Sequence, residues 1–216
     1  MTNQEIKGKT VTFVKSELRH AEGGHDWFHI ERVVNNARTI AQTERVNILI
    51  VELGALLHDI ADYKFNDGDE SVGVRKAQIF LKSLSVDEVV IDHVEKIITN
   101  ISFKGGNFTQ AFHSAELAVI QDADRLDAIG AIGIARTFNY GGYKGRELYN
   151  PSIKPSVGMT AKEYKNSNTP TINHFYEKLL LLKDRMNTDT GRRMAEQRHQ
   201  FMERYLEQFF KEWDAG

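Results

Sequence analysis

Apolar residues recur every three or four positions along most of this 216-residue chain, a spacing that places them on one face of an α-helix. The stripe is clearest after residue 26. It consists of Ile30, Val33, Val34, Ala37, Ile40 and Ala41. Asp26 precedes the stripe and can accept a hydrogen bond from a free backbone N–H of the first turn. The pattern therefore predicts an amphipathic helix that begins directly after Asp26.

The same periodicity predicts helices along most of the remaining sequence. Further helices are expected over residues 3–21, 48–61, 70–83, 114–140, 171–186 and 190–213. Asn47 can cap the helix over 48–61, and Ser85 with Glu88 fits a capping box that would open another helix. No stretch shows a convincing strand alternation. We therefore predict an all-α fold in a single domain.

The helix predicted over residues 48–61 is apolar on most sides, which indicates a central position in the fold. Its end is polar, because His58 and Asp59 follow the apolar run and Asp62 comes shortly afterwards. Burying an imidazole and two carboxylates costs free energy unless hydrogen bonds or a cation compensate them. This end of the helix therefore requires compensating groups from elsewhere in the chain.

Residues 141–170 differ from the rest of the chain. They contain all three prolines and several glycines. A loop of this length is unusual inside a compact domain, so the segment is predicted to be either a lid or partly disordered. Tyr140, Tyr143 and Tyr149 could stack on a nucleotide base, although tyrosine is also common in ordinary loops.

Composition narrows the function. The formal net charge is -2, so nothing indicates a nucleic-acid or membrane partner. The chain has no cysteine, and any metal would therefore be held by His, Asp and Glu. No apolar run is long enough to cross a membrane, and the first residues do not resemble a signal peptide. We expect a cytoplasmic protein.

Two further segments place metal-binding residues near the predicted core. His29 precedes Val33 by one turn on the apolar stripe of its helix. The largely apolar stretch 118–129 is interrupted by Asp122, Asp124 and Asp127, and the residues alone do not distinguish among these three. A shared cation would explain why separate helices each bring an acid or an imidazole to an apolar face.

The order of the candidate metal ligands along the chain resembles that of a known family. His29, then His58-Asp59, then Asp124 within Ala123-Asp124-Arg125-Leu126 resembles the HD-domain metal-dependent phosphohydrolase superfamily. The dipeptide His-Asp alone carries little information, since His25-Asp26 is another example. Longer phrases at 24–27, 122–130 and 173–179 are similar to small bacterial members of the YedJ/YpgQ type, and the likeness spans about residues 20–213.

The resemblance implies a single-domain HD-type helical bundle over residues 1–216. Its parts would be a metal-site core over about 20–140, the loop 141–170 and C-terminal helices over 171–214. It also implies a divalent metal ion held by His29, His58, Asp59 and Asp124. Such mixed nitrogen and oxygen ligands suit manganese, which we favour, and also Fe, Co, Ni or Zn, while Mg suits them less.

The resemblance also suggests roles around the metal. Asp59 and Asp62 are the candidate catalytic residues. Asp62 follows His58 by four residues, where related enzymes often carry a glutamate that orients or deprotonates water. The shorter aspartate leaves a substrate-binding role equally open. Lys64 and Lys178 are the preferred cations for substrate phosphates, and His93 either lines the pocket or is an ordinary core histidine.

The expected function is hydrolysis of a small-molecule nucleotide, most specifically of a nucleoside triphosphate to a monophosphate and pyrophosphate. The alternatives within this class are a phosphomonoesterase, a cyclic-nucleotide phosphodiesterase and an alarmone hydrolase, because one metal site can serve each of them. A different alternative is a non-catalytic regulatory module that binds a nucleotide in the same pocket. The sequence also leaves a homodimer open.

Overall fold

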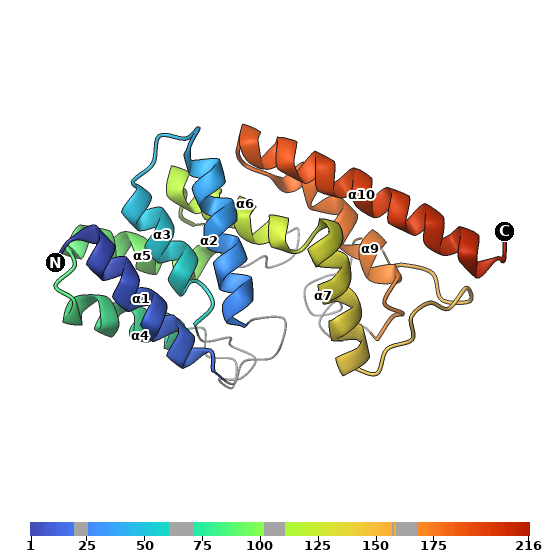
Figure 1. Ribbon diagram of the computed structural model, residues 1–216, viewed down its shortest axis with the longest axis horizontal. Coiled ribbons are helices and arrows are strands. Elements are labelled where there is room, and N and C mark those ends of the chain that lie inside the picture. Colours follow the sequence, from blue (N-terminus) through green and yellow to red (C-terminus); the bar gives the residue numbers. More distant parts are fainter. Residues whose placement is uncertain (20–25, 61–70, 102–110, 157, 159–167) are drawn as a thin grey trace. The chain divides into compact units, whose positions relative to one another are not determined.

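The computed structural model describes residues 1–19, 26–60, 71–101, 111–156, 158 and 168–216. Over these residues the chain forms helices and no strand, which confirms the all-α prediction (Figure 1). The described residues up to Ala123 form one compact unit, and those from Asp124 onwards form a second. The boundary between the two units falls within helix α6, and the single-domain organisation stays a prediction.

The first unit is built around a buried central helix. It contains α1 (Asn3–Glu17), α2 (Trp27–Ala41), α3 (Ile48–Leu57), α4 (Ser71–Ser83), α5 (Glu88–Asn100) and most of α6 (Ala115–Asp127). Helix α3 packs against α1, α2 and α5, and all of its residues from Ile50 to Leu57 are buried. A Cβ added at Gly54 would lie 2.6 Å from the Ile120 side chain, so α3 and α6 approach closely there. The predicted central position of this helix is confirmed.

Local capping chemistry explains where two of these helices begin. The Asp26 carboxylate accepts a hydrogen bond from the His29 backbone N–H at 2.9 Å, and Asn47 accepts one from Leu49 at 3.0 Å, so both predicted caps are confirmed. The predicted Ser85–Glu88 capping box is wrong. Asp87 caps α5 instead, because Ser85 has a φ of 53°, outside the extended conformation typical of a capping residue.

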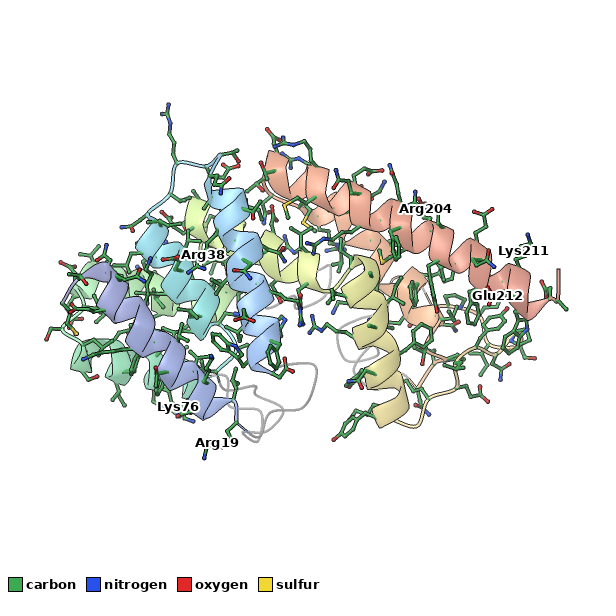
Figure 2. The ribbon with its side chains drawn as sticks, in the orientation of Figure 1. Arg19, Arg38, Lys76, Arg204, Lys211 and Glu212 are labelled. Carbon is green, nitrogen blue, oxygen red and sulfur yellow. The ribbon has the colours of Figure 1, made fainter. Side chains whose placement is uncertain are left out.

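The central helix carries a charged residue into the interior of the first unit. Glu52 of α3 is 4% exposed, and its carboxylate contacts Lys7 of α1 at 2.8 Å and Arg38 of α2 at 2.7 Å. Arg38 is labelled in Figure 2, which also labels Lys76 of α4, bonded to Glu17 of α1 at 2.6 Å. A buried carboxylate requires such compensation, so Glu52 links three helices through its two cations.

The second unit contains the end of α6 and a series of shorter elements followed by a long terminal helix. These are α7 (Gly130–Tyr143), α9 (Asn173–Glu177), the 3₁₀ turns η2 (Leu179–Leu181) and η3 (Lys183–Arg185), and α10 (Asp189–Trp213). Helix α10, red in Figure 1, packs against α7. The continuous helix predicted over 171–186 is wrong, because α9 ends at Glu177 and only 3₁₀ turns follow.

The single helix predicted over 114–140 is also wrong, because the chain turns between α6 and α7. Gly130, the first residue of α7, has a φ of 74°, which the interior of a continuous α-helix cannot accommodate. Arg136 donates to the Asp127 carbonyl at 3.2 Å, and Arg198 donates to the Leu126 carbonyl. These side chains satisfy carbonyls that a continuing helix would have bonded itself.

Only part of the predicted loop 141–170 lies among the described residues. Helix α7 continues into it as far as Tyr143. Two backbone hydrogen bonds then join its ends, from Thr171 to the Glu147 carbonyl at 2.8 Å and from Ile172 to the Leu148 carbonyl at 3.0 Å. The middle of the loop falls at 157 and 159–167, outside the described residues, so a lid function stays a prediction.

Candidate metal centre

Three of the four predicted metal ligands lie together in the first unit. One ligand atom from each of His29, His58 and Asp59 falls within 4.8 Å of the other two. His29 is 2% exposed, and the other two residues are half-buried. Ligands about 2.1 Å from one ion lie at most about 4.2 Å apart, so a small inward movement of these side chains would accommodate a single ion. The cluster therefore has the donor types and the spacing of a metal site.

His29 is fixed by the start of α2. It lies in the first turn of that helix, and its backbone N–H is the group that the Asp26 cap binds. Its ring meets the His58 ring edge-on, with centroids 5.4 Å apart and an interplanar angle of 67°. The capping residue therefore positions the buried imidazole against the imidazole of the next helix.

His58 is oriented by the end of α3. Its Nδ1 lies 2.9 Å from the Ala55 carbonyl oxygen, and because a carbonyl can only accept, Nδ1 carries the hydrogen. In the neutral ring, Nε2 then keeps its lone pair, as a metal ligand requires. The last carbonyls of a helix also carry partial negative charge, so this end of α3 favours a cation.

The fourth predicted ligand, Asp124, is not part of this three-residue cluster and stays a prediction. Ala123, the residue before Asp124, is hydrogen-bonded to the helix that bears His29. The side-chain amide of Asn36 on α2 donates to the Ala123 carbonyl at 3.2 Å. The other two aspartates of this stretch are more buried. Asp127 has a structural partner, because its carboxylate accepts a bond from Arg136 at 2.6 Å.

The structure does not bring His93 to the cluster. Its Nε2 shares a hydrogen bond of 2.9 Å with Ser114 Oγ and lies 3.5 Å from the Glu116 carboxylate. Glu116 also accepts a bond from the backbone N–H of Asn47, the residue that caps the start of α3. His58 is at the opposite end of this 10-residue helix, about 15 Å away along the axis.

The remaining predicted site residues are placed elsewhere or not described. Asp62 and Lys64 lie outside the described residues, as does His25. Lys178 follows α9 in the second unit. Tyr149, a candidate for stacking on a base, packs instead against Phe210 and Trp213 at 5.2 and 5.0 Å between ring centroids.

The sequence pattern does not identify Asn36 or Arg136. These two residues form hydrogen bonds with Ala123 and Asp127, near the two ends of the aspartate-rich stretch of α6. Asn36 gave a usable signal, because it follows His29 by seven residues and so lies on the same face of α2. Arg136 gave no such signal, since its partner became reachable only through the turn between α6 and α7.

Comparisons with known proteins agree with this arrangement. The family model for the HD domain matches residues 27–129. Protein YpgQ of Bacillus subtilis is 40% identical over 204 residues, which cover 93% of this chain and 90% of YpgQ. The crystal structure of an HD-superfamily hydrolase from Bacillus thuringiensis is 46% identical, covers 100% of both chains and superposes with a TM-score of 0.80. The crystal structure of B. subtilis YpgQ in complex with ADP is 38% identical, with a TM-score of 0.78 over 98% of this chain and 97% of that one. The chain is therefore a member of the HD superfamily of hydrolases, and its fold is of the HD type.

Proposed function

We propose that this protein is a divalent-metal-dependent phosphohydrolase that converts a nucleoside triphosphate to a monophosphate and pyrophosphate. The observation that carries the proposal is the cluster of His29, His58 and Asp59, whose atoms could share one ion. Membership of a hydrolase superfamily supports the reaction class. The ADP complex of the B. subtilis relative YpgQ supports a nucleotide substrate.

The donor set fits a divalent ion of the first transition series. Two imidazoles and a carboxylate suit manganese, which we propose as the metal, although iron, cobalt, nickel and zinc accept the same ligands. Asp124 is proposed as the fourth ligand on the family pattern. A bound ion would make an attached water more acidic and withdraw charge from the phosphorus that the water attacks.

The protein's own residues would orient that reaction. His29 and His58 would each offer a ring nitrogen to the ion, and Asp59 would contribute a carboxylate oxygen and negative charge. Asp62 is proposed to orient the attacking water or take its proton, at the position where related enzymes often have glutamate. Lys64 and Lys178 are proposed to bind the phosphates that are not attacked.

The first test joins metal content to turnover. His58→Ala and Asp59→Ala should each lose both the bound metal and the activity, because each removes a ligand from the cluster. His199→Ala is the control, since His199 lies on α10 and contacts Glu203 at 3.2 Å. The measurements are elemental analysis of the purified proteins and a nucleotide panel with several metals, with every product identified by mass.

The outcomes are distinct. An Asp59→Ala protein with normal metal content and normal rate would contradict the site assignment. Free phosphate from a monophosphate, or cleavage of a cyclic nucleotide or an alarmone, would replace the proposed substrate but keep the metal site. A metal-loaded protein that binds nucleotide and hydrolyses none of the panel would instead be the regulatory module.

The setting of the reaction also stays a prediction. Among the described helices, none has the length and apolar character needed to cross a membrane. A cytoplasmic location, the lack of a nucleic-acid partner and the choice between monomer and homodimer are separate predictions. Gel filtration with light scattering would decide the last of these.

A further inference from the structure

Asn36 connects the helix that carries His29 to the helix that carries Asp124. Its side chain is hydrogen-bonded to the Ala123 carbonyl at 3.2 Å, and because a carbonyl can only accept, the amide nitrogen is the atom that faces α6. Asn36 is half-buried, and Ala123 is fully buried. The bond therefore fixes the backbone of α6 one residue before Asp124.

This hydrogen bond is not needed to satisfy the Ala123 carbonyl. Ala123 lies four residues before Asp127, where α6 ends, and in an α-helix each carbonyl accepts from the N–H four residues further on. The carbonyls without such a donor are those of the last four residues of a helix, which follow Ala123. Asn36 thus offers a second donor to a carbonyl for which the helix already has one. Its effect is on where α6 lies rather than on how α6 ends.

The place of Asn36 along α2 relates it to the metal cluster. It follows His29 by seven residues, which is two helical turns, so the two side chains lie on one face of α2, about 10.5 Å apart along the axis. The Asp26 cap fixes His29 at the start of the same helix. One face of α2 therefore carries a metal ligand at one point and, two turns later, holds the backbone next to a proposed ligand.

The residue on the other side of Asp124 has a contact within the second unit. Arg125 donates to the Arg185 carbonyl at 2.6 Å, and both residues belong to that unit. Asn36 and Ala123 belong to the first unit, as does the metal cluster. The Asn36 bond therefore ties α6, immediately before Asp124, to the unit that contains the cluster.

We propose that Asn36 is a positioning residue for the metal centre, which holds α6 where the Asp124 carboxylate can serve as the fourth ligand. The inference rests on the proposed function, in which Asp124 binds the ion. A single methylene group joins an aspartate carboxylate to the backbone, so a displacement of α6 moves the carboxylate almost as far. Residues that orient metal ligands without touching the ion change the metal affinity by roughly 10- to 100-fold when they are replaced.

Calorimetric titration of the metal-free protein with Mn²⁺ measures this effect without requiring turnover. Asn36→Leu keeps most of the side-chain volume but loses the donor, and it should weaken Mn²⁺ binding by about tenfold. Asn36→Gln keeps an amide donor on a longer side chain and should lose less affinity. Asn35→Leu is the matched control, because Asn35 is the exposed neighbour on the same helix, and its affinity for Mn²⁺ should not change.

A double variant tests whether Asn36 acts through Asp124. Asp124→Ala alone should weaken Mn²⁺ binding, and adding Asn36→Leu should weaken it no further, because the carboxylate that Asn36 positions is then absent. Fully independent losses in the double variant would overturn the proposal. So would a purely structural role, in which Asn36→Leu lowers the melting temperature of the metal-free protein but leaves the Mn²⁺ affinity of the folded protein unchanged.

The outcomes separate this proposal from the proposed function. Circular dichroism would establish that each variant is folded, and Asn36→Ala replaces Asn36→Leu if the leucine variant does not fold. If Asn36→Leu bound Mn²⁺ as tightly as the unaltered protein while Asp124→Ala bound it more weakly, the positioning role would be rejected and the metal site kept. An Asp124→Ala protein with unchanged affinity would remove the fourth ligand and the positioning role together. An unaltered protein that bound no Mn²⁺ would contradict the metal centre itself and therefore both proposals.

Discussion

Replacing Gly130 with alanine tests how the turn between α6 and α7 is held. A residue with a side chain costs roughly 1–2 kcal/mol in the left-handed conformation that Gly130 adopts. The new Cβ would also lie 3.0–3.1 Å from Arg198 Cγ and Cβ. Arg198 would have to move, and because its guanidinium donates to the Leu126 carbonyl, part of that bond is lost, at about 1 kcal/mol.

One effect opposes these losses. Alanine reduces the conformational freedom of the unfolded chain, which stabilises the folded protein by about 0.4–1 kcal/mol. The net expectation for Gly130→Ala is therefore a destabilisation of about 1–2.5 kcal/mol. In a chain of this size each kcal/mol lowers the melting temperature by about 2–4 °C. Urea unfolding followed by circular dichroism would measure the change in free energy.

Gly142→Ala is the matched control, because Gly142 lies in α7 of the same unit and a Cβ there would meet no atom within 4 Å. It should be neutral or stabilise the protein by up to about 1 kcal/mol. Gly133→Ala should destabilise most, since its Cβ would clash with the backbone carbonyl of Ala128, which cannot move aside as a side chain can. If the Gly130 and Gly142 variants were equally stable, the left-handed conformation and the close packing would not limit this turn.

Two further predictions concern buried ionisable groups. Lys7→Met and Arg38→Met should each lower the free energy of unfolding by about 1 kcal/mol, because one cation still contacts the Glu52 carboxylate. The double variant leaves that carboxylate buried without either cation and should lower the free energy of unfolding by about 3–5 kcal/mol. Purely additive losses in urea unfolding would contradict this reasoning. Burial gives His174 a folded-state pKa of about 3 against 6.5 for the free side chain, so the unfolded state binds the proton first, and stability is lost as the pH falls from about 6.5 towards 3. Between about pH 7.5 and pH 5 the unaltered protein should lose about 2 kcal/mol that His174→Gln does not lose, and equal pH dependence of the two unfolding free energies would refute the assignment.

The parts of the fold that the sequence predicted are those decided by local chemistry. Asp26 and Asn47 were recognised as caps because a short polar side chain before an apolar stripe bonds to backbone groups two or three residues away. The central position of α3 followed from its nearly continuous apolar run. The proximity of His29, His58 and Asp59 was expected from their positions on α2 and at the end of α3, together with the order of these residues in the family.

The parts that were missed depend on contacts between distant segments. The turn at Gly130 requires Arg198, which comes 68 residues later in the numbering, to bond with the end of α6. Ser85 and Asp87 are both acceptable caps by residue type, and only the backbone conformation of Ser85 decides between them. Periodicity carries no information about either choice.

His93 shows a second limit of periodicity, and it bears on where a metal site of this kind can lie. The helical spacing placed His93 near the apolar stripe of α5, one turn before Ile97, and the structure agrees that Ile97 is buried beside Gly54 of α3. Periodicity predicts which face of a helix is buried, but it does not predict which end of a neighbouring helix that face meets. The cluster of His29, His58 and Asp59 lies at the C-terminal end of α3. His58 is one turn beyond Gly54 along α3, whereas His93 is one turn before Ile97 along α5 and contacts the Glu116 that also bonds to the start of α3. The two helices therefore run in the same direction, and their pairing carries His93 away from the cluster. A ligand or substrate contact from α5 would have to come from the other end of that helix, after Ile97.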